Sequence, residues 1–315
     1  MKCRICPHSC GVDRKTSLGV CRAPDVPQIA LASLHHWEEP AISGTQGSGT
    51  IFFSHCNLAC AFCQNWDISQ GAGDKPGQVR GQEVTFERLR EIAFELKAQG
   101  AHNINLVSPT PYSEMIREAL LPVKQKLGIP VVWNSNAFEL VSTLRSLELL
   151  VDVYLPDLKF HSPEVSKRYC GTWDYFGYAG KAIEEMWRQK KDFRLQNSDC
   201  RMQSGRQTRS APSGSTIEQG VIIRHLVIPG QVEDSKRILG WIADNIGTEV
   251  HISLMAQYTP VHQAIEHAEV NRRLRRSEYD AVCDYFEKLG FENGWVQELT
   301  SASSEYTPDF DLKGV

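Results

Sequence analysis

Short apolar runs alternate with longer amphipathic segments along most of the chain. The run at residues 50–53 is typical of a buried strand, and residues 84–99 follow it as an amphipathic helix that ends at Gly100. The alternation repeats through further strand-like runs, which begin at Ile104, Val131, Val151, Val221 and Val250. The helix-like segments that accompany them cover residues 112–127, 138–150, 179–191, a stretch from Asp234, and 278–289. The pattern predicts about six consecutive βα units.

Successive βα units indicate an α/β fold. Right-handed crossovers between them would place the strands in parallel, as a partial (β/α)6 barrel of the TIM type. Each apolar run is nearly continuous, which is typical of strands with helices on one face and a packed interior on the other. A doubly wound open sheet produces the same alternation, so periodicity leaves both arrangements open. In the last helix, Ser277 followed by Asp280 predicts a capping box.

Two segments depart from this alternation. Residues 1–45 are rich in Cys, Pro, Gly and His and have no sustained periodicity, which indicates a small segment in which a metal replaces the missing core. Residues 192–217 are rich in Ser, Arg, Gln and Gly and have no apolar face, which predicts a flexible surface insertion. We therefore expect a cysteine-rich metal-binding segment at 1–45 and the barrel at 46–315.

The charge of the chain excludes some classes of partner. Lys and Arg total 34 against 38 Asp and Glu, which gives a formal net charge of -4. This balance provides no electrostatic footprint for nucleic acid or an anionic membrane. The N-terminus has no apolar run of signal-peptide length, and no stretch is long enough to span a membrane. We expect a cytoplasmic protein that binds neither nucleic acid nor membrane.

The ten cysteines carry the strongest chemical signal. The cytosol disfavours disulfides, and seven of the ten lie before residue 64 in two tight groups, as expected of metal ligands. Cys56, Cys60 and Cys63 form a CxxxCxxC loop directly after the first predicted strand, where α/β barrels carry their chemistry. Three thiolates on a 4Fe-4S cluster leave one iron open to a substrate or cofactor. The alternative is a closed zinc site completed by His55 or another histidine.

A second group of cysteines lies at the N-terminus and consists of Cys3, Cys6, Cys10 and Cys21. Four thiolates within so short a segment are enough to close a metal site. The number of ligands does not distinguish a tetrahedral zinc from an auxiliary 4Fe-4S cluster. Both metals stay open at this point.

The CxxxCxxC loop, with the aromatic Phe62 before its last cysteine, resembles the signature of radical S-adenosylmethionine (SAM) enzymes. The resemblance extends over most of the chain and is closest to proteins related to pyruvate formate-lyase activating enzyme. The segments that carry it are CQNW from Cys63, NLVSPTP from Asn105, WNSNAFE from Trp133, VYLPDLKF from Val153, RHLVIPGQVEDSK from Arg224, SLMAQYTP from Ser253 and GWVQELTS from Gly294.

This resemblance implies an enzyme in which the open iron of a 4Fe-4S cluster chelates SAM. An electron from a reductant such as flavodoxin or ferredoxin then cleaves SAM into methionine and a 5'-deoxyadenosyl radical, which abstracts hydrogen. The implied hydrogen donor is a glycine of a partner glycyl radical enzyme, and the alternative is a small molecule or a modified amino acid. A zinc-stabilised scaffold without turnover is the alternative from a different functional class.

The resemblance also implies residues that hold SAM. The backbone of Phe62 is at the position that meets the adenine. After the second strand, Ser108 and Thr110 stand where many relatives carry a GGE motif for the methionyl amine. Hydroxyls and backbone carbonyls could supply those contacts instead.

Further candidates follow the later strands, namely Asn134, Asn136, Asp157, Lys159 and His225. Lys159 either pairs with the methionyl carboxylate or forms a structural ion pair with Asp157. His225, next to Arg224, either lines the cavity or is a core residue.

Overall fold

A mostly parallel sheet forms the centre of the protein. The computed structural model describes residues 2–71, 79–196, 215–299 and 308–315. The strands are β1 (Gln28–His35), β2 (Ser48–Phe53), β3 (Gln82–Glu83), β4 (Ile104–Val107), β5 (Val131–Ser135), β6 (Val153–Pro156), β7 (Arg194–Leu195), β8 (Ile217–Leu226), β9 (His251–Met255) and β10 (Gly294–Val296). The helices are α1 (Pro40–Ser43), α2 (Phe86–Ala98), α3 (Ser113–Leu120), α4 (Lys124–Leu127), α5 (Val141–Leu147), α6 (Pro163–Cys170), α7 (Tyr175–Lys190), α8 (Val232–Asn245) and α9 (Arg276–Lys288).

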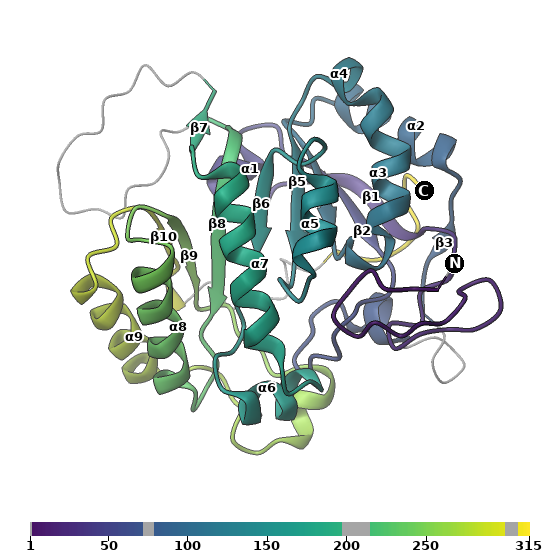
Figure 1. Ribbon diagram of the computed structural model, residues 1–315. Helices are drawn as coiled ribbons and strands as arrows, with labels where there is room; N and C mark the ends of the chain where they lie inside the picture. Colours follow the sequence, from purple (N-terminus) through teal and green to yellow (C-terminus); the bar gives the residue numbers. More distant parts are fainter. Residues whose placement is uncertain (1, 72–78, 197–214, 300–307) are drawn as a thin grey trace.

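The order of the strands decides between the two arrangements that periodicity left open. Along the sheet the order is β10-β9-β8-β6-β5-β4-β2-β1-β3, and the strands from β2 to β10 on this path are parallel. A doubly wound sheet reverses its order at a switch point, and this sheet does not. Crossovers of one hand then leave the helices on one face, as Figure 1 shows for α5, α7 and α8. The predicted α/β fold with a partial barrel is confirmed.

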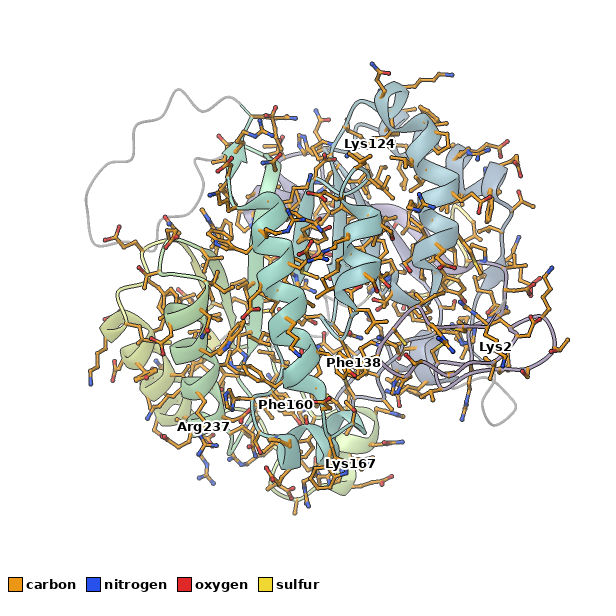
Figure 2. The ribbon with its side chains drawn as sticks, in the orientation of Figure 1. Lys2, Lys124, Phe138, Phe160, Lys167 and Arg237 are labelled. Atoms are coloured by element: carbon orange, nitrogen blue, oxygen red, sulfur yellow. The ribbon has the colours of Figure 1, made fainter. Side chains whose placement is uncertain are left out.

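Apolar side chains from the sheet and the helices fill the interior. Trp133 of β5 and Ile51 of β2 are fully buried in it. Complete burial of such a side chain stabilises a fold by about 1.5–3 kcal/mol. In Figure 2, Phe138 and Phe160 lie inside the molecule, whereas Lys124 and Lys167 are at its rim.

Helix α2 follows directly from its sequence. The Thr85 hydroxyl accepts the Arg88 backbone N–H at 3.1 Å and caps the first turn. Gly100, with φ 98°, follows the last turn. The buried face consists of Leu89, Ile92, Ala93 and Leu96. The helix predicted at 84–99 is therefore confirmed to within two residues at each end.

Residues 112–127 do not form the single helix that the sequence predicts. They divide into α3, a 3-10 turn at Leu121–Val123 and α4. Pro122 is the reason, because it has no N–H to donate and its ring collides with the preceding turn of a helix. The apolar periodicity continues across Pro122, so only the proline itself indicates that the helix is interrupted.

The capping box predicted for α9 was wrong in its position. The helix begins at Arg276, so Ser277 already lies in its first turn. The Glu278 carboxylate accepts the backbone N–H of Arg275 at 3.0 Å. Glu278 thus takes the role that was predicted for Asp280.

The cysteine-rich segment expected at 1–45 is partly incorporated into the sheet. Strand β1 pairs antiparallel with β2, with Ala32 opposite Ile51 and Ser33 opposite Thr50. Strand β1 contains the apolar run Ile29-Ala30-Leu31-Ala32, but half of it is alanine, which is a weak strand former. The part of this segment without long regular elements is residues 2–27.

The insertion expected at 192–217 also contributes to the sheet at both of its ends. Strand β7 pairs antiparallel with the beginning of β8, with Leu195 opposite Ile217. Residues 197–214 lie outside the described residues. The prediction of flexibility for that stretch is therefore not tested.

Candidate active site

A cavity of about 230 Å³ opens at the carboxyl ends of the parallel strands. Nine of the residues predicted for the cluster and SAM line it: Cys56, Cys60, Phe62, Cys63, Ser108, Asn134, Asn136, Asp157 and Lys159. Asn134 belongs to β5 itself, and the others come from the loops after β2, β4, β5 and β6. Parallel barrels place their chemistry at this edge because the carboxyl ends of all strands meet there.

Three of these loops leave their strands through a left-handed residue. His55 has φ 70°, Ser108 has φ 55° and Ala137 has φ 59°. Such values are uncommon for residues other than glycine and concentrate at functional sites, where the surrounding structure enforces them. The backbone at the cavity is therefore held in place by the fold.

The cysteine loop is anchored to two other elements. The Ala59 and Ala61 N–H groups donate to the carbonyls of Cys170 and Tyr169 at the end of α6, at 3.3 and 2.8 Å. The Asn57 side-chain amide donates to the Phe138 carbonyl at 2.7 Å. The three predicted ligands therefore sit on a loop with a fixed path.

The electrostatics of this loop favour protonated thiols when no metal is bound. Burial raises the pKa of Cys56 to about 12 and that of Cys63 to about 11. The contact with Cys170 and burial raise the pKa of Cys60 well above its usual value. Lys159 opposes the shift at all three cysteines, because its positive charge favours thiolates. A metal must therefore displace protons on binding.

The donor set fits a metal cluster, although it is not preassembled. Among the described residues, no group of three or more Cys, His, Asp or Glu side chains converges at metal-binding distance. The Leu58 N–H points at Cys56 Sγ at 3.5 Å, and the Asn65 N–H supports Cys63. Backbone donors of this kind stabilise a thiolate. A shared metal centre would require the three side chains to turn towards it.

A network of charged residues faces the cysteine loop. Lys159 Nζ donates to Asp157 Oδ2 at 2.7 Å, and Arg224 Nε donates to Asp157 Oδ1 at 2.7 Å. Arg224 also donates to Glu38 Oε2 at 3.3 Å and to Asn134 Oδ1. Burial raises the pKa of Asp157, but Arg224 and Lys159 outweigh it and bring that pKa below its usual value. Asp157 is therefore ionised and bridges two cations.

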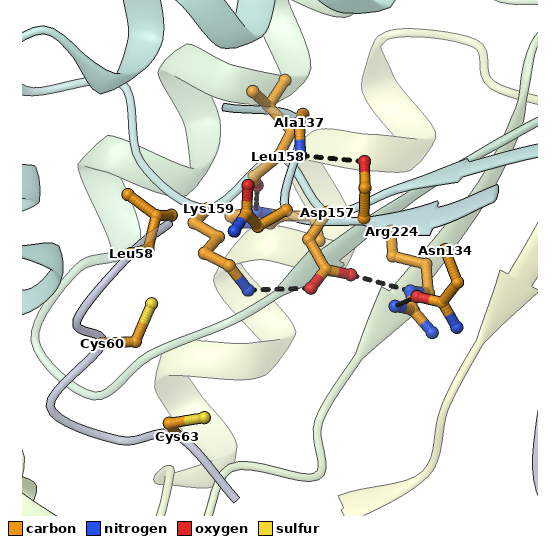
Figure 3. A network of polar contacts seen from close by, with 12 residues as sticks. Leu58, Cys60, Cys63, Asn134, Ala137, Asp157, Leu158, Lys159 and Arg224 are labelled. Carbon is orange, nitrogen blue, oxygen red and sulfur yellow. Dashed lines mark hydrogen bonds and ion pairs between the residues drawn. The ribbon is translucent and has the colours of Figure 1, made fainter. Parts of the chain in front are cut away.

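Figure 3 shows the consequence for Lys159. Its ammonium lies between Asp157 and the loop that carries Cys60 and Cys63. The ion pair between Lys159 and Asp157, which the sequence left as one alternative, is present.

Two predicted residues lie outside the cavity. The Thr110 hydroxyl donates to the buried carboxylate of Glu139 at 3.0 Å, which also accepts from Trp133 and Ser135. His225 is buried, and its Nδ1 lies 2.7 Å from the Leu158 carbonyl. Neither side chain lines the cavity, because each is directed into the packed layer behind it. His225 therefore has the core position that the sequence left as one alternative, and the Thr110 hydroxyl is engaged by Glu139 rather than directed at the cavity.

Among the residues absent from the predicted set, two contact the charged network or a predicted cysteine ligand. Glu38, on the connection from β1 to α1, lines the cavity and accepts from the Asn105 amide at 2.9 Å. Cys170, at the end of α6, has its Sγ 3.4 Å from that of Cys60. Neither belongs to a motif, since both reach the site from segments far away in the sequence.

The N-terminal cysteines lie in a segment that packs against the active-site loops. Cys6 is buried, and Cys3, Cys10 and Cys21 are half-buried. His8 Nε2 lies 2.7 Å from the carbonyl of Asn57, which follows Cys56. The two cysteine groups are therefore neighbours in the structure as well as in the sequence.

No described helix is long and apolar enough to cross a membrane.

Comparison with known proteins gives a family and two kinds of relative. Residues 50–186 match the family described as the Radical SAM superfamily. The chain is 31% identical over 293 residues to the uncharacterized protein MJ0674 of Methanocaldococcus jannaschii, covering 92% of this chain and 75% of that protein. It is 24% identical over 182 residues to the uncharacterized protein MJ0808 of the same organism, covering 54% of this chain and 52% of that protein.

Among solved structures, Streptococcus suis SuiB bound to the precursor peptide SuiA is similar with a TM-score of 0.50 and 13% identity. The match covers 79% of this chain and 48% of the SuiB chain, so this chain spans about half the length of that structure. At this identity the likeness concerns the fold alone.

Proposed function

The chain belongs to the radical SAM superfamily, and on this basis we propose that it holds a 4Fe-4S cluster through Cys56, Cys60 and Cys63 and cleaves SAM reductively. The supporting observation is that these three thiols share one cavity with Lys159 at the carboxyl ends of the strands. Three ligands on one loop leave a fourth iron open to a second ligand. A protein reductant such as flavodoxin or ferredoxin belongs to the same proposal.

The residues of the chain prepare this chemistry electrostatically. When bound, the cluster supplies the electron that divides SAM into methionine and the 5'-deoxyadenosyl radical. Lys159 offsets the negative charge of the three thiolates, and Asp157 holds the ammonium in place at 2.7 Å. Lys159 has further N–H donors that can turn to the methionyl carboxylate. Phe62, Ser108, Asn134 and Asn136 line the remaining wall and are the proposed contacts for the rest of SAM.

The charges in the cavity bear on the hydrogen donor. Each charged lining residue already contacts an opposite charge, since Asp157 pairs with Lys159 and Arg224, and Glu38 pairs with Arg224. Burial lowers the pKa of His35, another lining residue, so it is neutral. A wall of this kind offers no uncompensated charge to a charged substrate. This supports a neutral hydrogen donor, such as the α-carbon of a glycine in a partner polypeptide.

The direct test is reductive cleavage of SAM. Anaerobic protein given SAM and dithionite should release 5'-deoxyadenosine and methionine, measured by liquid chromatography. Cys60→Ala should abolish the release, because it removes a primary cluster ligand. Cys283→Ala, on the half-buried face of α9, is the matched control and should retain it.

Two results would contradict the proposal. One is release of 5'-deoxyadenosine from Cys60→Ala at the wild-type rate. The other is zinc in place of iron at both cysteine groups, which would favour a scaffold without turnover.

A further inference from the structure

A buried arginine in the N-terminal segment has no carboxylate partner among the residues that the structure describes. Arg14 is 8% exposed, and its Nε and Nη1 donate to the carbonyls of Ala23 and Pro111 at 2.9 and 2.6 Å. Its Nη2 has no hydrogen-bond partner, and no described carboxylate forms an ion pair with it. A guanidinium stays charged in a protein, and burying an unpaired charge is strongly unfavourable. An anion close to the Arg14 guanidinium would offset this cost.

The nearest candidates for that anion are the N-terminal cysteines. Arg14 Nε donates to the carbonyl of Ala23, two residues after Cys21, and the Cys3 N–H donates to the carbonyl of Val12, two residues before Arg14. Cys21 in turn interacts with Cys3 and Cys10, and Cys6 interacts with all three. The four cysteines therefore lie in one short segment that also carries Arg14, although among the described residues no three of these side chains converge at metal-binding distance.

The backbone around these thiols is arranged for negatively charged sulfur. Val20 N–H donates to Cys10 Sγ at 3.4 Å. The His8 N–H supports Cys6 and the Ala23 N–H supports Cys21, each two residues after its cysteine. The cluster loop repeats this spacing, with Leu58 after Cys56. Such N–H donors favour thiolates over thiols.

A glycine completes the approach to Cys10. A Cβ built on Gly19 would stand 3.0 Å from Cys10 Sγ and 3.3 Å from its Cβ. A side chain at residue 19 would crowd the sulfur, so glycine favours this close approach of the chain at 19–20.

We propose that Cys3, Cys6, Cys10 and Cys21 bind one metal centre as thiolates and that Arg14 is its built-in counter-charge. Four thiolates around a divalent zinc, or around an oxidised 4Fe-4S cluster, carry a net charge of about -2. Arg14 compensates part of this charge, and the anionic metal–thiolate centre is the partner that the described residues do not provide for Arg14. The site is separate from the proposed SAM chemistry and does not depend on it.

Arg14 also connects this site to the active-site loops. Pro111, whose carbonyl accepts from Arg14, lies on the loop that begins with Ser108 in the cavity wall. The guanidinium packs over the Tyr112 ring at 5.4 Å. The Thr143 hydroxyl donates to the Ile5 carbonyl at 2.7 Å, which fastens the same segment to α5. Metal at the N-terminal site therefore supports the cavity wall mechanically.

The test uses the full chain with Cys56, Cys60 and Cys63 replaced by Ala, so that any metal belongs to the N-terminal site. Elemental analysis should find about one zinc or about four iron atoms per chain, which distinguishes the two metals. In this background Arg14→Met should weaken metal retention against a competing chelator by about 10- to 100-fold, as loss of a residue that supports the ligands does. Arg14→Lys keeps the charge and should stay within a few-fold of the parent.

Lys15→Met is the matched control, because Lys15 is exposed next to Arg14 and should leave retention unchanged. The proposal fails if the parent holds no metal, or if Arg14→Met retains metal as tightly as the parent. It also fails if Arg14→Lys loses metal as readily as Arg14→Met, since the hydrogen bonds rather than the charge would then be responsible. Where Arg14→Met does not fold, Arg14→Gln carries the same comparison. Failure here leaves SAM cleavage untouched, because that test depends on Cys60.

Discussion

Cys170 is a residue without a motif that lies against a proposed cluster ligand. Its Sγ is 3.4 Å from Cys60 Sγ, and its carbonyl accepts the Ala59 N–H, so the backbone fixes the two cysteines side by side. In iron-free protein we expect diamide to join them: the two thiols lose two hydrogens to the diazene, which becomes a hydrazine. The raised pKa of the Cys60 thiol will make the reaction slow at neutral pH, because the thiolate is the nucleophile.

Peptide mass spectrometry without reductant checks this expectation. Cys170→Ser should prevent the cross-link and allow iron-sulfur reconstitution after diamide treatment, whereas Cys283→Ser should not. A dominant cross-link between Cys56 and Cys63 would contradict the geometry.

Also at the residue scale, the alternation of side chains along a strand distinguishes two neighbouring candidates for the cavity wall. Arg224 and His225 are adjacent in β8, and neighbouring side chains of a strand point to opposite faces. Arg224 lines the cavity and His225 faces Leu158. The sequence therefore contained the information that only one of them could reach the cofactor. It did not contain the approach of Glu38, which depends on tertiary packing.

At the scale of elements, Glu278 shows how one carboxylate joins three segments. Arg272 forms a bidentate pair with it, at 2.7 Å for each bond, and the backbone N–H groups of Gly230 and Arg275 donate to it at 2.8 and 3.0 Å. Arg272 lowers the pKa of Glu278 from 4.5 to about 2. The ionised carboxylate thus fastens the start of α9 to the connection that precedes α8.

We expect Glu278→Gln to lower the free energy of unfolding by about 1–2 kcal/mol at pH 7, because it replaces charge-assisted hydrogen bonds by neutral ones. The pKa is lowered in the folded state, so the stabilisation is present above about pH 4.5 and is lost as the pH falls through about 2. Urea unfolding at several pH values should show the difference shrink towards low pH. Glu287→Gln, at an exposed position of the same helix, should show no such trend.

An element can be predicted from the sequence where local residues mark its two ends. Helix α6 has Ser162 as a cap, Pro163 in its first turn and Gly171 after its end, all of which are readable from the sequence, although its apolar face is too short to attract attention. Strand β1 offers no such signals and is defined by its pairing with β2. Local chemistry marks the ends of elements, whereas pairing decides whether a weak strand exists.

At the scale of the whole molecule, the order of the strands in the sheet is the feature that could not be predicted from the sequence. Periodicity is identical in a partial barrel and a doubly wound sheet, since both alternate buried strands with covering helices. The candidate site was nevertheless predictable, because Ser108, Asn134 and Asp157 follow or end strands, and parallel strands end at one edge in both architectures. The position of the site therefore follows from the parallel direction of the strands, whereas the barrel follows from the order of the strands in the sheet.

The same reasoning makes the connection from β7 to β8 the part of the molecule that can be shortened. Its described ends already meet, because the Gln196 N–H donates to the Thr216 carbonyl at 2.7 Å. Ile217 begins β8 and Leu226 ends it at the cavity, so at about 3.3 Å per residue the connection starts about 30 Å from the cavity along the strand. Deletion of residues 202–214 leaves less than a third of the stretch at 197–214. Loop closure entropy then changes by only about 1 kcal/mol.

We therefore expect this deletion variant to keep its melting temperature within a few degrees and to keep its iron-sulfur absorbance and its yield of 5'-deoxyadenosine. A variant with the same residues replaced by an equally long Gly-Ser linker separates the effect of length from that of sequence. If the deletion variant folds but both variants lack the chromophore, residues 202–214 contribute directly to the site despite the distance of their attachment points. If only the deletion variant loses it, the length of the connection rather than its side chains is what the site requires.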